Sequence, residues 1–415
     1  MEHHSVAISD GRIIAVMPTD AAAARFAARE HVALPDAALI PGLVNAHTHA
    51  SMALMRGIAD DLSLMRWLRE HIWPVEAKHV SPEFVYDGTL LAAAEMLRGG
   101  VTCANEMYFY PGDAAQAFVD AGMRAAIGII AIDFPTQYGT GPDDYLAKGL
   151  AVRDRYRDEP LLSFCMAPHA PYTVSDRTFE RMIAIAEELD APIHVHLHET
   201  DDEIRTSVTK FGVRPIERLA ALGLLSPRLI AVHAVHLSAS EIERLGVARV
   251  SIAHCPSSNL KLASGFAPIA ALAAAGANIA LGTDGAASNN RLDLFQEMRT
   301  AALLAKAVAN DAEALPAHAA LAAATIGGAR ALGLDAKIGS IEVGKLADLV
   351  AVSLDDWATR PCYDVVSQLV YACGREHVSD VWVAGERKVA RRQQIFARAA
   401  ALENRILLWQ NKLLD

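Results

Sequence analysis

The central part of the chain, residues 39–336, alternates short apolar runs with longer segments of helical periodicity. This alternation is typical of repeated strand–helix units and of a parallel sheet. The pattern predicts eight strands, within residues 39–47, 100–108, 123–133, 161–169, 191–198, 228–236, 249–256 and 278–284. Eight such units predict a closed (β/α)₈ barrel of the TIM type, whose active site lies at the carboxyl ends of the strands.

The two chain ends show a different pattern. Residues 3–18 alternate apolar and polar positions around an Asp-Gly pair, which predicts a β-hairpin. Residues 338–354 and 377–390 show a similar alternation, and the last residues have the periodicity of an amphipathic helix. We therefore expect a barrel, a small β-sandwich built from both chain ends, and a C-terminal helix, in residues 39–336, 1–38 with 337–395, and 396–415.

Composition and charge narrow the classes of function. The chain of 415 residues carries 38 Lys and Arg against 49 Asp and Glu, a net charge of −11, and no basic stripe. This disfavours a nucleic-acid partner. The sequence has no apolar run of about 18 residues and no secretory start, so we expect no membrane partner. Its five widely spaced cysteines lack a CxxC pair, which favours a reducing, cytoplasmic location.

Histidines and an aspartate gather at the predicted strand ends. In "PIHVHLHETDDE", His194, His196 and His198 alternate with apolar residues and would share one face of a strand, and Glu199 follows at once. A single histidine near a strand end is more often a buried structural residue than a ligand. The other strand ends add His47, His49, His169, His233, His236, His254 and Asp284. Together they predict a metal centre.

The ligand types indicate which metal fits. Zinc and iron accept imidazole and carboxylate ligands, and a catalytic site keeps one position open for water. His47, His49, one histidine of the 191–198 strand and Asp284 would supply four protein ligands.

Several longer motifs carry a family resemblance. They are "PGLVNAHTHASMALMRGIADDLSLMRWL", "PHAPYTVS", "HLHET", "HCPSSNLKLASG" and "LGTDGAASNN". With them the chain resembles the amidohydrolase superfamily, and in particular its 5′-methylthioadenosine/S-adenosylhomocysteine deaminases. The resemblance implies four metal ligands and three catalytic residues: His47, His49, His196 and Asp284 as ligands, Glu199 as acid/base, His233 orienting the attacking water, and Asp284 accepting its proton.

The resemblance also implies substrate contacts and one metal. His169 would contact the base and Glu76 the ribose hydroxyls, while Glu199 and Asp284 face the reacting ring. Trp73 would stack on the base or simply pack against its loop, and packing is the favoured interpretation. The fourth strand ends in "CMAPHAPY" without a bridging lysine. One divalent ion per chain follows, zinc first, with iron or manganese as alternatives.

The expected reaction converts 5′-methylthioadenosine to 5′-methylthioinosine and ammonia. Relatives that accept S-adenosylhomocysteine pair its carboxylate with an arginine, and here Gly128 stands at the apparent equivalent position. We therefore expect S-adenosylhomocysteine and adenosine to be weaker substrates. Apolar residues would form the tail pocket, namely Ile129, Ile130, Phe134 and Pro135.

Two alternatives stay open. One is another ring hydrolase of the superfamily, a guanine- or pterin-type deaminase or a triazine chlorohydrolase, and the other is an inactive scaffold that only binds partners. The complete ligand set and Glu199 argue against the scaffold. Barrels of this family are often dimers or tetramers, so a homo-oligomer is compatible with the resemblance.

Overall fold

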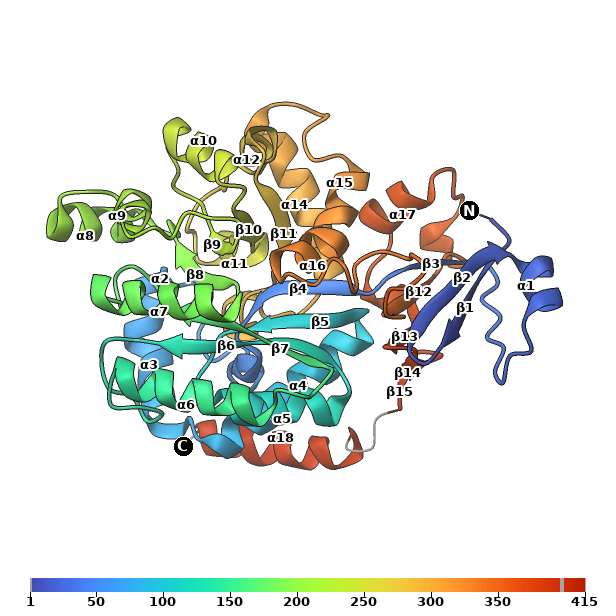
Figure 1. Ribbon diagram of the computed structural model, residues 1–415, viewed down its shortest axis with the longest axis horizontal. Coiled ribbons are helices and arrows are strands. Elements are labelled where there is room, and N and C mark those ends of the chain that lie inside the picture. Colours follow the sequence, from blue (N-terminus) through green and yellow to red (C-terminus); the bar gives the residue numbers. More distant parts are fainter. Residues whose placement is uncertain (1, 396–398, 415) are drawn as a thin grey trace.

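A computed structural model describes residues 2–395 and 399–414 of the chain (Figure 1). Its centre is an eight-stranded parallel sheet in the order β11-β10-β9-β8-β7-β6-β5-β4. The strands are β4 (Leu43–Thr48), β5 (Val101–Glu106), β6 (Arg124–Ala131), β7 (Leu162–Pro168), β8 (Ile193–Leu197), β9 (Leu229–His233), β10 (Ser251–His254) and β11 (Asn278–Leu281). The predicted barrel is confirmed.

The two outer strands of this sheet, β4 and β11, approach each other at the seam of the barrel. There the Asp284 N–H donates to the carbonyl of His47 at 3.0 Å. The barrel is thus nearly closed, and the seam joins two residues of the predicted metal centre.

Helices cover the outside of the barrel. Those of the first half are α4 (Pro82–Arg98), α5 (Pro111–Ala121), α6 (Pro142–Arg155), α7 (Asp176–Leu189), α8 (Asp201–Phe211) and α9 (Pro215–Ala221). Those of the second half are α10 (Ala239–Val247), α11 (Pro256–Lys261), α12 (Ile269–Ala275), α13 (Ala286–Asn289), α14 (Leu294–Ala309), α15 (Ala317–Ala322) and α16 (Gly328–Ala331). A π-helical turn, Ala323–Gly327, joins α15 to α16.

The connection after β4 is long and largely helical. It contains a 3₁₀ helix, Ala50–Met55, then α2 (Leu64–Trp67), a π-helical turn, Leu68–Ile72, and α3 (Trp73–His79). Its apolar residues, among them Met55, Trp67 and Ile72, form one core cluster with residues of other elements, such as Phe84 of α4. This connection carries the predicted substrate residues Trp73 and Glu76.

Antiparallel strands from both chain ends lie beside the barrel (Figure 1). A five-stranded sheet has the order β15-β14-β13-β12-β3, and β1 pairs with β2 as the predicted hairpin. The strands are β1 (His4–Ser9), β2 (Arg12–Pro18), β3 (Ala37–Pro41), β12 (Leu349–Ser353), β13 (Val378–Val383), β14 (Glu386–Ala390) and β15 (Gln393–Gln394). The remaining short helices are α1 (Thr19–Arg25), α17 (Val365–Tyr371), and the 3₁₀ turns Trp357–Thr359 and Arg375–His377.

Two element boundaries bear on the expected division of the chain, which stays a prediction. The boundary at residue 38 falls inside β3, which pairs with β12, and the chain enters the barrel only after Gly42. A Cβ at Gly42 would lie 2.0 Å from Thr102 Oγ1, so the crossing from one sheet to the other requires glycine. Within residues 338–354 only Leu349–Ser353 is a strand, because the preceding Gly339 and Gly344 adopt left-handed turns.

The C-terminal helix α18 (Ala399–Leu414) packs along α4 (Figure 1). Trp409 donates its indole N–H to the buried Asp87 carboxylate at 2.8 Å, which fixes the helix in place. The first three residues of the expected 396–415 segment, and its last, lie outside the described residues. Among the helices that the structure describes, none is long and apolar enough to cross a membrane.

Candidate metal centre and active site

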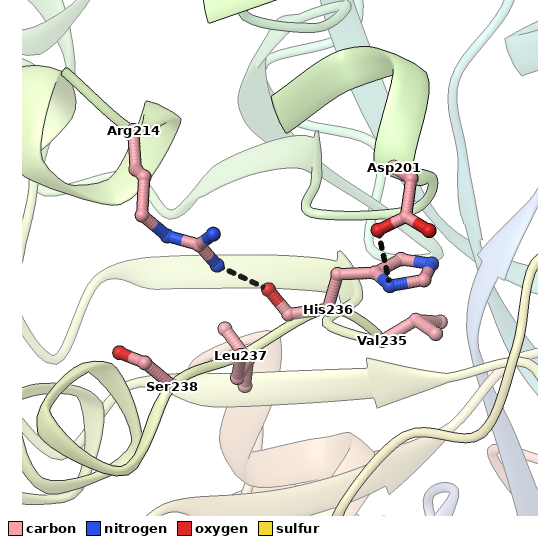
Figure 2. A pocket seen from close by; sticks show the side chains of 6 residues that line it. All are labelled: Asp201, Arg214, Val235, His236, Leu237 and Ser238. Carbon is pink, nitrogen blue, oxygen red and sulfur yellow. Dashed lines mark hydrogen bonds and ion pairs between the residues drawn. The ribbon is translucent and has the colours of Figure 1, made fainter. Parts of the chain in front are cut away.

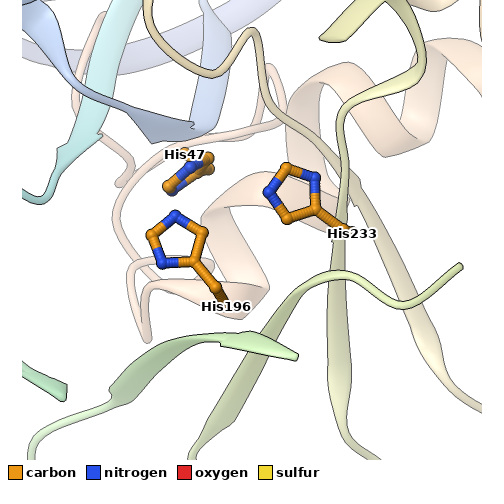
Figure 3. A group of neighbouring side chains, drawn as sticks. All are labelled: His47, His196 and His233. Atoms are coloured by element: carbon orange, nitrogen blue, oxygen red, sulfur yellow. The ribbon is translucent and has the colours of Figure 1, made fainter. Parts of the chain in front are cut away.

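Three histidines and one aspartate converge at the carboxyl end of the barrel. His47 lies in β4 and His49 just beyond it, His196 lies in β8, and Asp284 follows β11. The Nε2 atoms of His47 and His49 lie 3.3 and 3.4 Å from Oδ1 of Asp284. The His47 and His196 rings are 4.9 Å apart (Figure 3). The strand ends therefore bring the four predicted ligands into one cluster.

Hydrogen bonds fix which nitrogen of each ring can act as a ligand. His49 Nδ1 bonds the carbonyl of Met107 at 2.5 Å, and His196 Nδ1 bonds the carbonyl of His169 at 2.7 Å. A carbonyl only accepts, so each neutral ring carries its proton on Nδ1 and keeps a free lone pair on Nε2. These are the ring orientations that a metal ion requires.

Burial keeps the His47 and His196 rings neutral. It lowers the pKa of His47 to about 4 and that of His196 well below its usual value. Among the described residues, the buried His47 Nε2 has no hydrogen-bond partner of good geometry. A buried ring nitrogen without a partner is costly. The donor set thus fits a divalent cation coordinated by imidazole and carboxylate.

Asp284 is held in its ionised form. Burial opposes the charge, but the close approach of His47 Nε2 to Oδ1 and the surrounding histidines keep the Asp284 pKa well below its usual value. Ser258 and Ser288 donate to its Oδ2 at 2.6 and 3.0 Å, while Oδ1 faces the histidines. The two oxygens are therefore distinguished, one bonded to hydroxyls and one directed at the cluster.

His233 and Glu199 stand next to these four residues. His233 ends β9, and its Nδ1 bonds Asn259 Oδ1 at 2.8 Å, so its Nε2 is free to accept a proton. That Nε2 lies 3.8 Å from Oε2 of Glu199. Burial, with a smaller contribution from the Asp284 charge, raises the Glu199 pKa to about 8. The raised pKa favours the protonated form of Glu199, beside an ionised carboxylate.

Comparisons with known proteins identify the family of the chain. The family model described as the amidohydrolase family matches residues 38–388. The chain belongs to the amidohydrolase family. The resemblance seen in its motifs is confirmed.

Several individual relatives are close in sequence. The chain is 48% identical to 5-methylthioadenosine/S-adenosylhomocysteine deaminases of Teredinibacter turnerae and Saccharophagus degradans, over 99% of its length and 92% of theirs. A zinc-bound adenosine deaminase structure from Xanthomonas campestris is 55% identical, with a TM-score of 0.98, covering 100% of this chain and 94% of that one. Atrazine chlorohydrolase from Arthrobacter aurescens is 23% identical, with a TM-score of 0.92 over 99% and 96% of the two chains, and shares the fold.

The three alternating histidines in and just after β8, His194, His196 and His198, have different partners. His194 is fully buried, and its Nε2 bonds Nδ1 of His47 at 2.9 Å. His198 lies beyond the strand, bonds the His236 carbonyl through Nδ1, and accepts the Ile216 N–H at Nε2. Of the three, only His196 joins the cluster with His47 and His233.

The predicted substrate residues differ in their surroundings. The His169 ring is 4.9 Å from the His196 ring, and Thr173 fixes its Nδ1 at 2.9 Å. Glu76 is partly buried on α3, and burial raises its pKa to about 7. Trp73 begins α3 and is 38% exposed, in contrast to the buried Trp67. Trp67 is therefore a packing residue, whereas part of the Trp73 indole is exposed and could contact a substrate.

Sequence reasoning missed several polar residues around the site. Asn259 and Ser258 lie on α11, and Tyr108 follows β5 and bonds Glu76. Glu106 is the last residue of β5, so the strand-end argument applied to this strand would have found it. It is 2% exposed, and its Oε2 accepts the Ala50 N–H at 2.8 Å.

The expected tail pocket is partly wrong. A Cβ on Gly149 of α6 would lie 2.4 Å from Ile129 Cγ2, so Ile129 packs outward between β6 and α6 rather than toward the site. Phe134 is 44% exposed on the loop after β6. Gly128, on the opposite face of the strand from Ile129, has no room for a side chain, because its Cβ would lie 2.6 Å from the Glu106 carbonyl oxygen. The strand alternation explains the error, since adjacent residues face opposite sides.

Proposed function

We propose that this protein hydrolytically deaminates an adenine nucleoside, 5′-methylthioadenosine first among them, to the 6-oxo nucleoside and ammonia. The relatives at 48% identity are named for this reaction, and the Xanthomonas structure is named an adenosine deaminase. One observation carries the proposal. Glu199 Oε2 lies 3.8 Å from His233 Nε2 in the same buried site as Asp284, and burial raises the Glu199 pKa while the Asp284 pKa is held low, which supports the pairing of acid and base that the reaction needs.

A divalent cation, zinc first with iron or manganese as alternatives, would be held by His47, His49, His196 and Asp284. Bound there, it would supply Lewis acidity and lower the pKa of a water molecule. The orphaned His47 Nε2 and the two Nδ1–carbonyl bonds support this ligand set. His233 Nε2 lies in a group of possible ligand atoms with His47 and His196, and we assign it to the attacking water rather than to the ion.

The chain's own residues would handle the protons. Asp284 Oδ1 accepts a proton from the attacking water, and His233 Nε2 accepts a hydrogen bond from the same water and orients it. Glu199 delivers its proton to N1 of the adenine ring, which makes C6 electrophilic. The C6–O bond forms, and the protonated Asp284 then gives its proton to the amino group. The C6–N bond breaks, ammonia leaves, and the C6 hydroxyl returns its proton to Glu199, which leaves the 6-oxo ring.

Three side chains would hold the nucleoside. His169, beside the His196 ring, contacts the base, and Glu76 accepts hydrogen bonds from the ribose hydroxyls. The exposed indole of Trp73 is free to stack on a ring at the entrance.

The preference for 5′-methylthioadenosine over S-adenosylhomocysteine rests on the lack of an arginine to pair with the tail carboxylate of the latter. No arginine occurs between Arg124 and Arg153. Arg153 lies near the end of α6, which runs back toward the amino ends of the strands, and it pairs with Asp154. A carboxylate in the tail would therefore lack a bidentate partner from this part of the chain. We infer that 5′-methylthioadenosine is preferred to S-adenosylhomocysteine, and we expect adenosine to be a weaker substrate as well.

A substrate panel tests the proposal. Loss of the 6-amino group is followed by absorbance, with ammonia measured in parallel, on the three nucleosides and on guanine, a pterin and a chlorotriazine. We expect kcat/KM to be highest for 5′-methylthioadenosine. A higher value for S-adenosylhomocysteine would contradict the substrate order, and turnover of the triazine or guanine alone would contradict the nucleoside assignment.

We infer that the reaction takes place in the cytoplasm. The five cysteines are free in the structure, four of them buried, which supports a reducing compartment. A homo-oligomer remains a prediction, and light scattering on the metal-loaded protein tests it.

A further inference from the structure

The Glu203 carboxylate lies beneath the turn that follows β8. Its Oε1 accepts the backbone N–H of His198, and its Oε2 accepts the backbone N–H of Glu199, both at 2.9 Å. The side chain is 4% exposed. Both oxygens are thus used to hold the backbone of the proposed acid and of the residue before it.

Ordinary helix capping does not account for this arrangement. In a capping box the third helical residue accepts the N–H of the N-cap residue itself, as Glu241 of α10 does with Ser238 at 2.7 Å. In α8 the N-cap is Thr200, whose hydroxyl accepts the Glu203 N–H at 3.3 Å. The Glu203 carboxylate, however, reaches past Thr200 to the two residues before it.

The turn that Glu203 holds is conformationally costly. His198 has a φ of 55°, a left-handed conformation that a residue with a side chain adopts only when its surroundings enforce it. The His198 ring is also fixed at both nitrogens, through the His236 carbonyl and the Ile216 N–H. Arg214 donates to the same His236 carbonyl at 2.7 Å (Figure 2).

The turn decides where Glu199 points. His196 is still in the strand, and five residues later, at Asp201, α8 begins. The left-handed residue between them redirects the chain, and without Glu203 the N–H groups of His198 and Glu199 would be buried without partners. A relaxed turn would move the Glu199 carboxyl relative to His233.

We propose that Glu203 is a positioning residue for the reaction: it holds the left-handed turn at His198 and so directs the Glu199 carboxyl at the substrate. This inference rests on the proposed function, because it assigns Glu203 a role through Glu199. Glu203 itself makes no contact with the substrate in this account.

The test is a double-mutant cycle of Glu203→Gln and Glu199→Gln on 5′-methylthioadenosine. A glutamine at 203 keeps one acceptor oxygen where two are needed, while size and fold are preserved. We expect Glu203→Gln to lower kcat roughly 10- to 100-fold, with KM within about threefold and the metal content unchanged. In the Glu199→Gln background the same change should alter kcat by less than about threefold, because the group that it positions is already gone.

Asp293→Asn is the matched control. Asp293 is another buried carboxylate, 3% exposed, that accepts two backbone N–H groups, those of Phe295 and Gln296, at the start of α14. We expect this variant to lose thermal stability as Glu203→Gln does, with kcat unchanged. A similar kcat loss in both variants would show that the effect is general destabilisation and would overturn the proposal.

A crystal structure of Glu203→Gln separates this inference from the proposed function. We expect a changed His198 φ and a displaced Glu199 carboxyl. A carboxyl in its original place, or an equal kcat loss in both backgrounds of the cycle, would overturn the positioning role. If the wild-type protein releases no ammonia from any adenine nucleoside, the proposed function fails, and the position of the Glu199 carboxyl in the crystal still decides the role of Glu203.

Discussion

The Tyr108 hydroxyl donates a 2.5 Å hydrogen bond to Oε1 of Glu76. Tyr108 is 5% exposed, and its ring centroid lies 6.3 Å from that of His49. The Tyr108 ring therefore lies beside the ring of a predicted metal ligand, and its hydroxyl holds the carboxylate that is proposed to bind the ribose. Oε2 of Glu76 takes no part in this bond and is available for a ribose hydroxyl. The bond fixes this carboxylate, which lies on the connection after β4, next to a residue that follows β5.

Removing the phenol should weaken substrate binding. We predict that Tyr108→Phe raises KM for adenosine about 3- to 10-fold, the range of one lost hydrogen bond, with little change in kcat. The increase should be smaller for 2′-deoxyadenosine, which lacks one hydroxyl. Tyr86→Phe, which breaks a 2.5 Å phenol–carboxylate bond to Asp120 between α4 and α5, is the control and should leave KM unchanged. Equal KM increases for the two nucleosides would argue against ribose recognition by Glu76.

The pH dependence of turnover should report the proposed acid. Glu199 must be protonated before it can donate, and its pKa is raised to about 8, so its proton is present through neutral pH and is lost above it. We predict that kcat/KM falls as pH rises through about 8. A kcat/KM profile from pH 6 to 10 checks this. A rate that rises through that range would show that the essential group acts as a base.

Stability should depend on pH through Glu106. Burial raises its pKa to about 8, above the usual value near 4.5, so the folded state binds this proton more tightly than the unfolded state. The free energy of unfolding should therefore fall as pH rises from about 4.5 to about 8, by a few kcal/mol. We predict that Glu106→Gln lacks this contribution, and that it gains stability relative to wild type between pH 5 and pH 8. Urea unfolding at the two pH values measures the difference, with the exposed Glu83→Gln as control. An unchanged difference would refute a raised Glu106 pKa.

Metal removal should affect activity and stability together. We predict that chelation abolishes turnover and lowers Tm, and that added zinc restores both, because the ion binds only the folded arrangement of ligands. His49→Ala should lose most of the bound metal, whereas the exposed His31→Ala should retain it. Metal analysis by mass spectrometry checks the content, and full activity after exhaustive chelation would contradict a metal-dependent reaction.

Much of the site could be predicted because the relevant signals are local. A strand has a period of two, and the strands of a parallel barrel deliver their last residues to one end, so His47, His196 and Asp284 could be brought together from the sequence. Three features depended on tertiary contacts. The partner of His233 is Asn259 on another element, the outward direction of Ile129 depends on the helix packed against it, and the change of sheet at Gly42 depends on Thr102.

The role of Glu203 could not be predicted from the sequence. Glu203 ends the same stretch that contains His196 and Glu199, yet the sequence gives no sign that its carboxylate turns back to bond the N–H groups of His198 and Glu199. That direction depends on a left-handed residue, and no rule of periodicity places one at a histidine.

The most direct test of the central claim is ammonia release from 5′-methylthioadenosine by wild type and by Glu199→Gln, each with its metal content measured. The substitution leaves all four proposed ligands in place, so we predict that both proteins hold about one ion per chain. We expect the wild type to release one ammonia for each nucleoside consumed, and the variant to be slower by roughly 100-fold or more. Near-normal ammonia release by the metal-loaded variant would contradict the assignment of Glu199 as the acid.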